Sequence, residues 1–241
     1  MPDAIFADPT LARLYDPLDP HRRDLDAYVA LARELGARSV LDVGCGTGTF
    51  ACLLAAEGFD VVGVDPAGAS LGVARAKPGA GRVRWLHGDA TTLPPLRVDL
   101  ATMTGNVAQV FLTDDDWAAT LEGVRVALAP GGHLVLETRD PARRAWEGWT
   151  QERTLARADV RGFGAVESWT EVTDVSGPLV TFRTTIELAD GRVLHSDSTL
   201  RFREHDEIEA SLHDAGYVVE EVRDAPDRPG LERVFVARAA G

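Results

Sequence analysis

The feature that most constrains this chain is a glycine-rich stretch, VLDVGCGTGTF, at residues 40–50. An apolar run containing Asp42 leads into three glycines at alternate positions, Gly44, Gly46 and Gly48. Glycines between a strand and a helix let the backbone approach a ligand closely, because no Cβ intervenes. The stretch therefore predicts a strand, a tight ligand-binding turn and a helix.

The rest of the chain repeats this alternation of strand and helix. Short apolar runs separated by helical spacing predict seven strands, at residues 39–43, 61–64, 83–86, 98–103, 134–136, 217–222 and 234–237. Strands alternating with helices in this rhythm are typical of parallel, doubly wound sheets. We therefore expect an α/β fold with a seven-stranded, mostly parallel, Rossmann-like sheet.

An antiparallel insert is expected after the fifth strand. Residues 165–203 show period-two alternation, which predicts about three strands, and Asp190-Gly191 is a hairpin signal. A two-residue turn there would pair Ile186 with His195 and place His195 and Asp197 on one mixed face.

These patterns divide the chain into three regions. Residues 1–37 are expected to form N-terminal lid helices. Residues 38–141 and 204–241 form the sheet domain, and residues 142–203 form the insert, which would serve as a substrate cap or a homodimer interface.

Composition narrows the class of protein. The 241 residues are 45% hydrophobic and carry a formal net charge of −13, which disfavours a protein that binds nucleic acid through phosphate contacts. No apolar run approaches the roughly 18 residues of a membrane span, and no secretory signal is readable. We expect a cytoplasmic protein that does not bind membranes. Cys45 and Cys52 do not suggest a disulfide framework, and no histidine has metal-ligand spacing with them, so we predict no metal.

The glycine pattern distinguishes between several kinds of ligand. A dinucleotide fingerprint, G-x-G-x-x-G, would need its third glycine at residue 49, which is Thr49, and no Gly-Lys-Ser/Thr of a phosphate-binding loop follows. Asp42 would attract a cationic ligand and repel a pyrophosphate.

Asp42, Gly44, Gly46 and Gly48 match the Asp-x-Gly-x-Gly-x-Gly pattern and resemble the first motif of class I S-adenosylmethionine-dependent methyltransferases. This resemblance implies S-adenosyl-L-methionine as cofactor, with Cys45 as a small residue of the turn rather than a nucleophile.

Further positions extend the resemblance over residues 38–139. Asp65, followed by Pro66, ends the second strand, where its carboxylate would accept hydrogen bonds from ribose hydroxyls; a helix cap is the alternative. Asp89 and Ala90 resemble the adenine motif of the family. The "PGGHL" run before the fifth strand and the "LHDAGYVVEEV" segment near the C-terminus also resemble family elements.

The resemblance also suggests where chemistry occurs. Thr104, Gly105 and Asn106 follow the fourth strand and would contact the methionine end of the cofactor; a loop-forming turn residue is the alternative for Asn106. They lack the Asn-Pro-Pro-aromatic motif of DNA amine methyltransferases. Tyr15 in "LARLYDPL" resembles a lid tyrosine of small-molecule N-methyltransferases, although simple packing is nearly as good an interpretation.

Two groups in the insert are candidates for acceptor contacts. His195 is a candidate general base, with a half-exposed strand histidine as the simpler interpretation. Trp146, Trp149 and Trp169 either line an aromatic acceptor pocket or pack in the core.

The sequence thus predicts methyl transfer by direct displacement to a nitrogen or oxygen nucleophile of a small molecule. The alternatives are an NAD-dependent oxidoreductase and a non-catalytic S-adenosylmethionine-binding protein.

Overall fold

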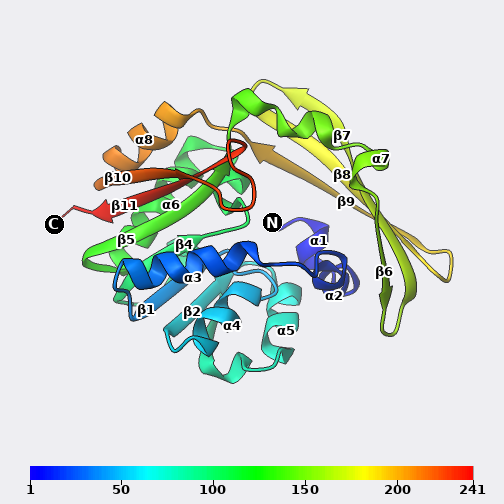
Figure 1. The fold of residues 1–241 in the computed structure, drawn as a ribbon, viewed down its shortest axis with the longest axis horizontal. Coiled ribbons are helices and arrows are strands. Elements are labelled where there is room, and N and C mark those ends of the chain that lie inside the picture. Colours follow the sequence, from blue (N-terminus) through cyan, green and yellow to red (C-terminus); the bar gives the residue numbers. More distant parts are fainter. Residues whose placement is uncertain (241) are drawn as a thin grey trace.

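The computed structural model describes residues 1–240, which form a seven-stranded sheet and a separate four-stranded sheet (Figure 1). The strand order of the larger sheet is β10-β11-β5-β4-β1-β2-β3. Its strands are β1 (Ser39–Val43), β2 (Asp60–Asp65), β3 (Val83–His87), β4 (Val98–Met103), β5 (Leu128–Arg139), β10 (Tyr217–Asp224) and β11 (Glu232–Ala239). All neighbours pair in parallel except β11, which runs antiparallel to both β5 and β10. The predicted fold class is confirmed.

Helices cover both faces of this sheet. They are α3 (Asp24–Glu34), α4 (Thr49–Ala56), α5 (Gly68–Ala76), α6 (Asp114–Ala127) and α8 (His205–Asp214), joined by short turns η1 (Ala80–Arg82), η2 (Ala90–Thr92) and η3 (Val107–Val110). The Pro130-Gly131-Gly132 run lies within β5, which begins at Leu128. It forms an irregularity in the strand, because the pairing with β4 shifts between Leu128 and His133.

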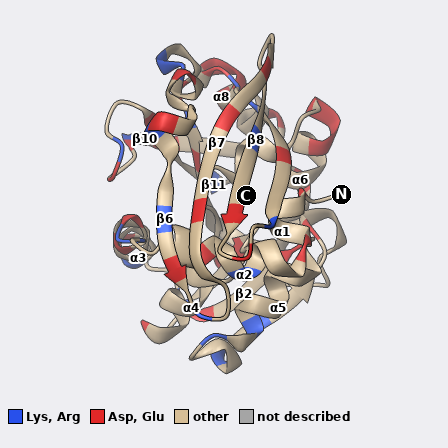
Figure 2. Ribbon diagram, turned by 90° about the vertical axis from the view of Figure 1, so that its right-hand side faces the viewer, with Lys and Arg blue, Asp and Glu red and all other residues tan. Residues whose placement is uncertain are grey.

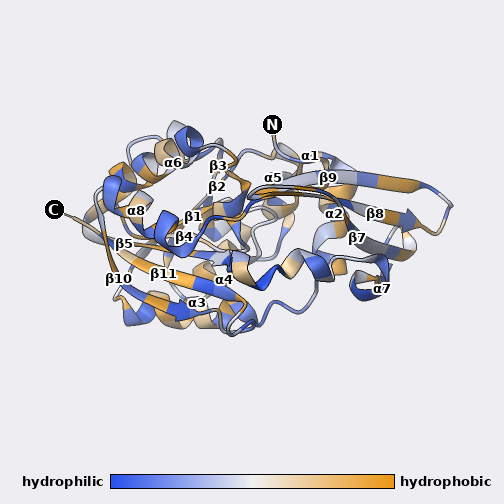
Figure 3. Ribbon diagram, turned by 90° about the horizontal axis from the view of Figure 1, so that it is seen from above, coloured by the Kyte–Doolittle hydropathy of each residue, from blue (hydrophilic) through white to orange (hydrophobic). Residues whose placement is uncertain are grey.

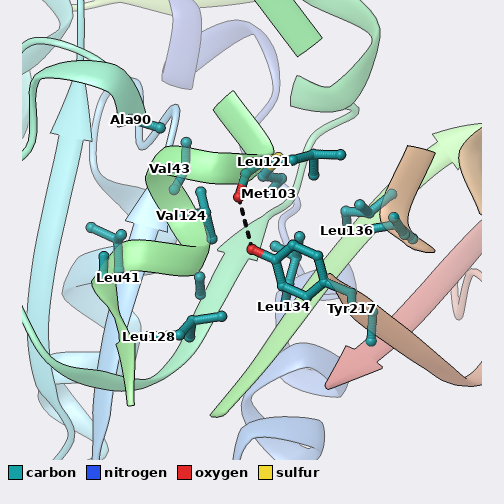
Figure 4. Packing of buried hydrophobic residues seen from close by; sticks show 14 of the residues in the cluster. Leu41, Val43, Ala90, Met103, Leu121, Val124, Leu128, Leu134, Leu136 and Tyr217 are labelled. Atoms are coloured by element: carbon teal, nitrogen blue, oxygen red, sulfur yellow. Dashed lines mark hydrogen bonds between the residues drawn. The ribbon is translucent and has the colours of Figure 1, made fainter. Parts of the chain in front are cut away.

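The core consists of two apolar layers, one on each side of the sheet. One contains Leu134, Leu136 and Tyr217 with residues of α6 and α8, and the other contains Val135 with residues of α3 and α4. Successive β5 residues thus point to opposite faces, as a strand requires. The Tyr217 hydroxyl donates to the Leu121 carbonyl oxygen at 3.0 Å within the first layer (Figure 4). Figure 3 shows the hydrophobic residues gathered along the strands.

The insert has the three strands expected over residues 165–203 and a fourth strand before them. They are β6 (Ala156–Val160), β7 (Gly164–Ser176), β8 (Leu179–Leu188) and β9 (Val193–Arg201), in that order, preceded by η4 (Pro141–Arg143), η5 (Ala145–Gly148) and α7 (Gln151–Thr154). The sequence gives little signal for β6, because only Val160 of its five residues is buried. Acidic and basic residues mark several of these strands (Figure 2).

The predicted register of the β8–β9 hairpin is wrong by one residue. The Leu188 N–H donates to the Arg192 carbonyl oxygen, which leaves a three-residue loop ending at Gly191 with a φ of +85°. A left-handed glycine at this position is usual for three-residue hairpins. His195 therefore pairs with Thr185 and not with Ile186.

The three N-terminal helices lie at two different places in the structure. Helices α1 (Ala4–Ala7) and α2 (Pro9–Leu18) lie between the two sheets (Figure 1). The Ile5 N–H donates to Ser196 Oγ of β9, and Ser70 Oγ of α5 donates to the Phe6 carbonyl oxygen. Helix α3, within the region expected to form the lid, packs on the large sheet through Leu25 and Tyr28. None of the helices in the described residues is long and apolar enough to cross a membrane.

Candidate cofactor and acceptor site

The glycine turn joins β1 to α4 and is tied to the end of β2. The N–H groups of Gly44 and Cys45 both donate to the Val64 carbonyl oxygen. Asp65 accepts from the Gly46 N–H at 2.8 Å through Oδ2 and from the Ala67 N–H at 2.7 Å through Oδ1. Each carboxylate oxygen keeps a lone pair for a further donor. Asp65 therefore organises the turn and can still accept from a ligand.

The three glycines have different surroundings. A Cβ on Gly44 would lie 2.6 Å from a methyl carbon of Val107, and one on Gly48 would lie 2.4 Å from the Trp85 ring. A Cβ on Gly46 would meet nothing within 4 Å. The first and third glycines are therefore required by packing. Gly46 alone faces open space where a ligand could approach the backbone.

Asp42, in β1 just before the turn, is 2% exposed. Its Oδ1 accepts from Thr102 Oγ1 of the neighbouring strand at 3.1 Å, whereas Oδ2 is buried with no partner. Burial raises the pKa of Asp42 to about 7. Burial also raises the pKa of the Cys45 thiol, so this side chain stays protonated, as expected of a small turn residue.

The Gly88-Asp89-Ala90 segment follows β3. Asp89 caps η2, because its Oδ1 accepts from the Thr91 N–H at 2.9 Å. The capping uses one carboxylate oxygen and leaves the exposed side chain able to accept a further donor. The Pro66 carbonyl oxygen lies 3.0 Å from His87 Nε2, which connects the ends of β2 and β3.

A buried polar network that the sequence analysis missed lies at the ends of β4, β5 and β11. Glu137 is 7% exposed and accepts from the N–H groups of Gly105 and Asn106. Asn106 Nδ2 donates to Glu232 at 3.3 Å, and Arg139 Nε lies 3.4 Å from the same carboxylate. The available signal was two charged residues, Glu137 and Arg139, ending an otherwise apolar strand.

Helix α2 is held against the glycine turn by contacts of Asp16. Asp16 Oδ1 accepts from Thr47 Oγ1 at 2.6 Å, and Asp16 Oδ2 lies 2.7 Å from Lys77 Nζ. The neighbouring Tyr15 ring packs on Phe6 at 5.5 Å. Burial raises the pKa of Tyr15, partly offset by the charge of Arg22, so its hydroxyl stays protonated. Tyr15 can therefore orient a ligand but is a poor general base.

Aromatic side chains gather between the insert and the end of β5. The Trp149 ring lies 4.9 Å from Phe182 and 6.2 Å from Phe202, and the Arg139 guanidinium lies 5.4 Å from the Trp149 ring centre. Trp146 packs on Phe202 at 4.5 Å. These two tryptophans fit the predicted aromatic group.

Trp169 and His195 do not belong to that group. Ile186 packs on Leu11 and Leu14 of α2, so its face of the insert points inward. Trp169 and His195 both pair with Thr185, which lies on the opposite face. His195 is exposed there, which argues against the general-base role predicted for it.

One cluster of side chains of the kinds that bind metal ions occurs among the described residues. Ligand atoms of His205, Asp206 and Glu209 lie within 4.8 Å of one another, and all three side chains are exposed on α8. None of them was among the predicted site residues.

Comparisons with known proteins agree with this geometry. Residues 40–132 match the methyltransferase domain family. The cypemycin N-terminal methyltransferase of a Streptomyces species is 36% identical over 119 residues, which is 49% of this chain and 49% of that protein. The chain thus aligns with about half the length of this curated relative.

Two solved structures share nearly the whole fold. The S-adenosylmethionine-bound amino pentose methyltransferase CalS10 of Micromonospora echinaspora has a TM-score of 0.70 at 24% identity, covering 94% of this chain and 97% of its own. The sugar N-methyltransferase KedS8 of a Streptoalloteichus species has a TM-score of 0.76 at 21% identity, covering 95% and 92%. With the matched domain, this common fold is that of class I S-adenosylmethionine-dependent methyltransferases.

Proposed function

We propose that this protein transfers a methyl group from S-adenosylmethionine to an amine nitrogen of a small molecule. The observation that carries the proposal is the arrangement at the ends of β1 and β4. Gly46 faces open space, and two buried acceptor atoms, Asp42 Oδ2 and Asn106 Oδ1, have no donor. Unpaired buried acceptors favour a ligand that brings positive charge and N–H donors.

S-adenosylmethionine fits these residues. It carries an ammonium and a sulfonium and no phosphate, so the carboxylate of Asp42 would not repel it. The turn at Gly44–Gly48 would hold it closely, Asp65 would accept from its ribose, Asp89 and Ala90 would face its adenine, and residues 104–106 would meet its methionine end. When bound, it supplies an activated methyl group for direct displacement.

The chain's own residues would orient the acceptor and exclude water. Helix α2, latched through Asp16, would cover the crevice with Tyr15. Trp149 and Arg139 would form the wall on the insert side. Alignment of this kind can supply about 7–11 kcal/mol of the barrier.

The acceptor class rests on the similar proteins. An amino pentose methyltransferase, a sugar N-methyltransferase and the cypemycin N-terminal methyltransferase are all among them, and an amine is the acceptor they suggest. Action in the cytoplasm and assembly as a homodimer stay predictions from the sequence.

The test has two stages. Calorimetric titrations with S-adenosylhomocysteine and with NAD should show binding of the first only; binding of NAD alone would support the oxidoreductase alternative. A panel of amino sugars and peptides with free N-termini, incubated with methyl-labelled S-adenosylmethionine, should then give a methylated product detectable by mass spectrometry. Tight cofactor binding with no product across amine and hydroxyl acceptors would support the non-catalytic alternative.

A further inference from the structure

The loop after β4 has an unusual backbone. Gly105 has a φ of +70° and Asn106 a φ of +62°. Asn106 is one of two described non-glycine residues with a positive φ. Asparagine adopts the left-handed conformation more readily than other non-glycine residues, although it is still uncommon there. Contacts from other segments can hold the loop in this conformation.

Glu137 provides those contacts. Its Oε1 accepts from the N–H groups of both Gly105 and Asn106, the latter at 3.1 Å, and its Oε2 accepts from the Tyr28 hydroxyl. The side chain is buried, and three donors satisfy it. Hydrogen bonds to a charged acceptor are stronger than those between neutral groups. A single carboxylate thus joins α3, β5 and the loop after β4.

The Asn106 side chain has only one orientation that satisfies its neighbours. Its Nδ2 donates to Glu232 Oε2, and Glu232 is held by Arg228 at 2.6 Å. A carboxylate only accepts, so the amide N–H group must point toward Glu232. Asn106 Oδ1 is consequently left as a buried acceptor with no partner.

We infer that Glu137 is a positioning residue that holds Gly105 and Asn106 so that Asn106 Oδ1 accepts from the ammonium of the cofactor. The inference rests on the proposed function for the identity of that ligand. Glu137 acts through the loop and does not itself touch the cofactor. Removal of the Glu137 carboxylate should weaken cofactor binding more than acceptor binding.

The main test is Glu137→Gln, with S-adenosylhomocysteine binding measured by calorimetry. Glutamine has one neutral acceptor oxygen and cannot replace the charged carboxylate that accepts from three donors. We therefore expect affinity for S-adenosylhomocysteine to fall about 10- to 100-fold. In steady-state assays KM for S-adenosylmethionine should rise by a similar factor, with KM for the acceptor changed less than two-fold. An unchanged affinity, or equal rises in both KM values, would overturn the inference.

Two further variants keep the inference testable if Glu137→Gln folds poorly. Asn106→Gly suits the left-handed backbone but lacks Oδ1, so it should fold normally and bind about ten-fold more weakly. Wild-type affinity in that variant would overturn the role of Oδ1. Tyr28→Phe keeps both loop contacts and should lose less affinity than Glu137→Gln, whereas equal losses would contradict loop positioning. If the wild-type protein itself bound no S-adenosylhomocysteine, the proposed function would fail instead.

Discussion

The two halves of the site hold their ligand-facing atoms by different means. At the ends of β1 and β2, the Gly46 N–H of the glycine turn donates to Asp65, and the shape of the turn depends on having no Cβ. At the ends of β4, β5 and β11, buried side chains from distant segments, Glu137 with Asn106 and Glu232, bond to one another and to the loop. The residues of the first half lie close together in the sequence, so their pattern can be recognised there. The second is assembled only by the fold.

The largest expected effect tests the backbone half. Gly46→Val should abolish detectable S-adenosylhomocysteine binding, a loss of at least about 100-fold, because its side chain would fill the open space before the turn. The substituted residue must also adopt a φ of +52°, at a cost of about 1–2 kcal/mol. Calorimetry on the purified variant measures the loss.

Gly36→Val is the matched control for this variant. Gly36 also has a left-handed φ, +67°, and open space around it, but it follows α3 outside the turn. It should show a similar drop in melting temperature and wild-type affinity. Equal binding by both variants would mean that Gly46 does not face the cofactor.

A smaller effect is expected from removing the carboxylate that links the turn to β2. Asp65→Ala leaves the Gly46 and Ala67 N–H groups without their acceptor and removes the predicted ribose contact. Affinity for S-adenosylhomocysteine should fall about 10- to 100-fold. Asp60→Ala, at the exposed start of the same strand, should bind like the wild type. A loss smaller than two-fold in Asp65→Ala would count against the assignment.

Local patterns explain which parts of the structure could be predicted. The β1 and β4 boundaries follow from apolar runs bounded by turn residues, and the cofactor motif follows from the spacing of Asp42, Gly44, Gly46 and Gly48. The hairpin register failed because two-residue and three-residue loops have the same Asp-Gly signal. The Glu137 network joins residues 109 and 31 positions apart, and no local pattern encodes such contacts.

A pH effect on stability is expected from Asp42, which lies where the two halves meet. Its pKa is raised by burial from 3.8 to about 7 in the folded protein. The protonated form is therefore favoured by folding. The stabilisation is complete below about pH 4 and is lost as the pH rises through about 7.

Chemical denaturation of the ligand-free protein at pH 5 and pH 8 measures this effect. The wild type should lose more unfolding free energy between the two than Asp42→Asn, by on the order of 1–4 kcal/mol. The shifted groups Asp65 and Glu137 change in the same direction but are common to both proteins. Identical losses in the two proteins would show that Asp42 is not buried as an unpaired carboxyl.

The smallest expected effect concerns the insert, which has an exposed outer face and an inner face that packs beside the site. His195 is exposed on the outer face, where it lies 3.2 Å from Thr185 Oγ1. Phe182 lies on the inner face and packs on Trp149 beside Arg139. With the acceptor that the amine panel identifies, His195→Ala should keep the wild-type rate and pH–rate profile, because its imidazole does not reach the crevice. Phe182→Ala should raise KM for the acceptor several-fold, since the position of Trp149 depends on it. If His195→Ala instead removed a titration near neutral pH, the outer face would carry the base and the division of the insert into two faces would be wrong.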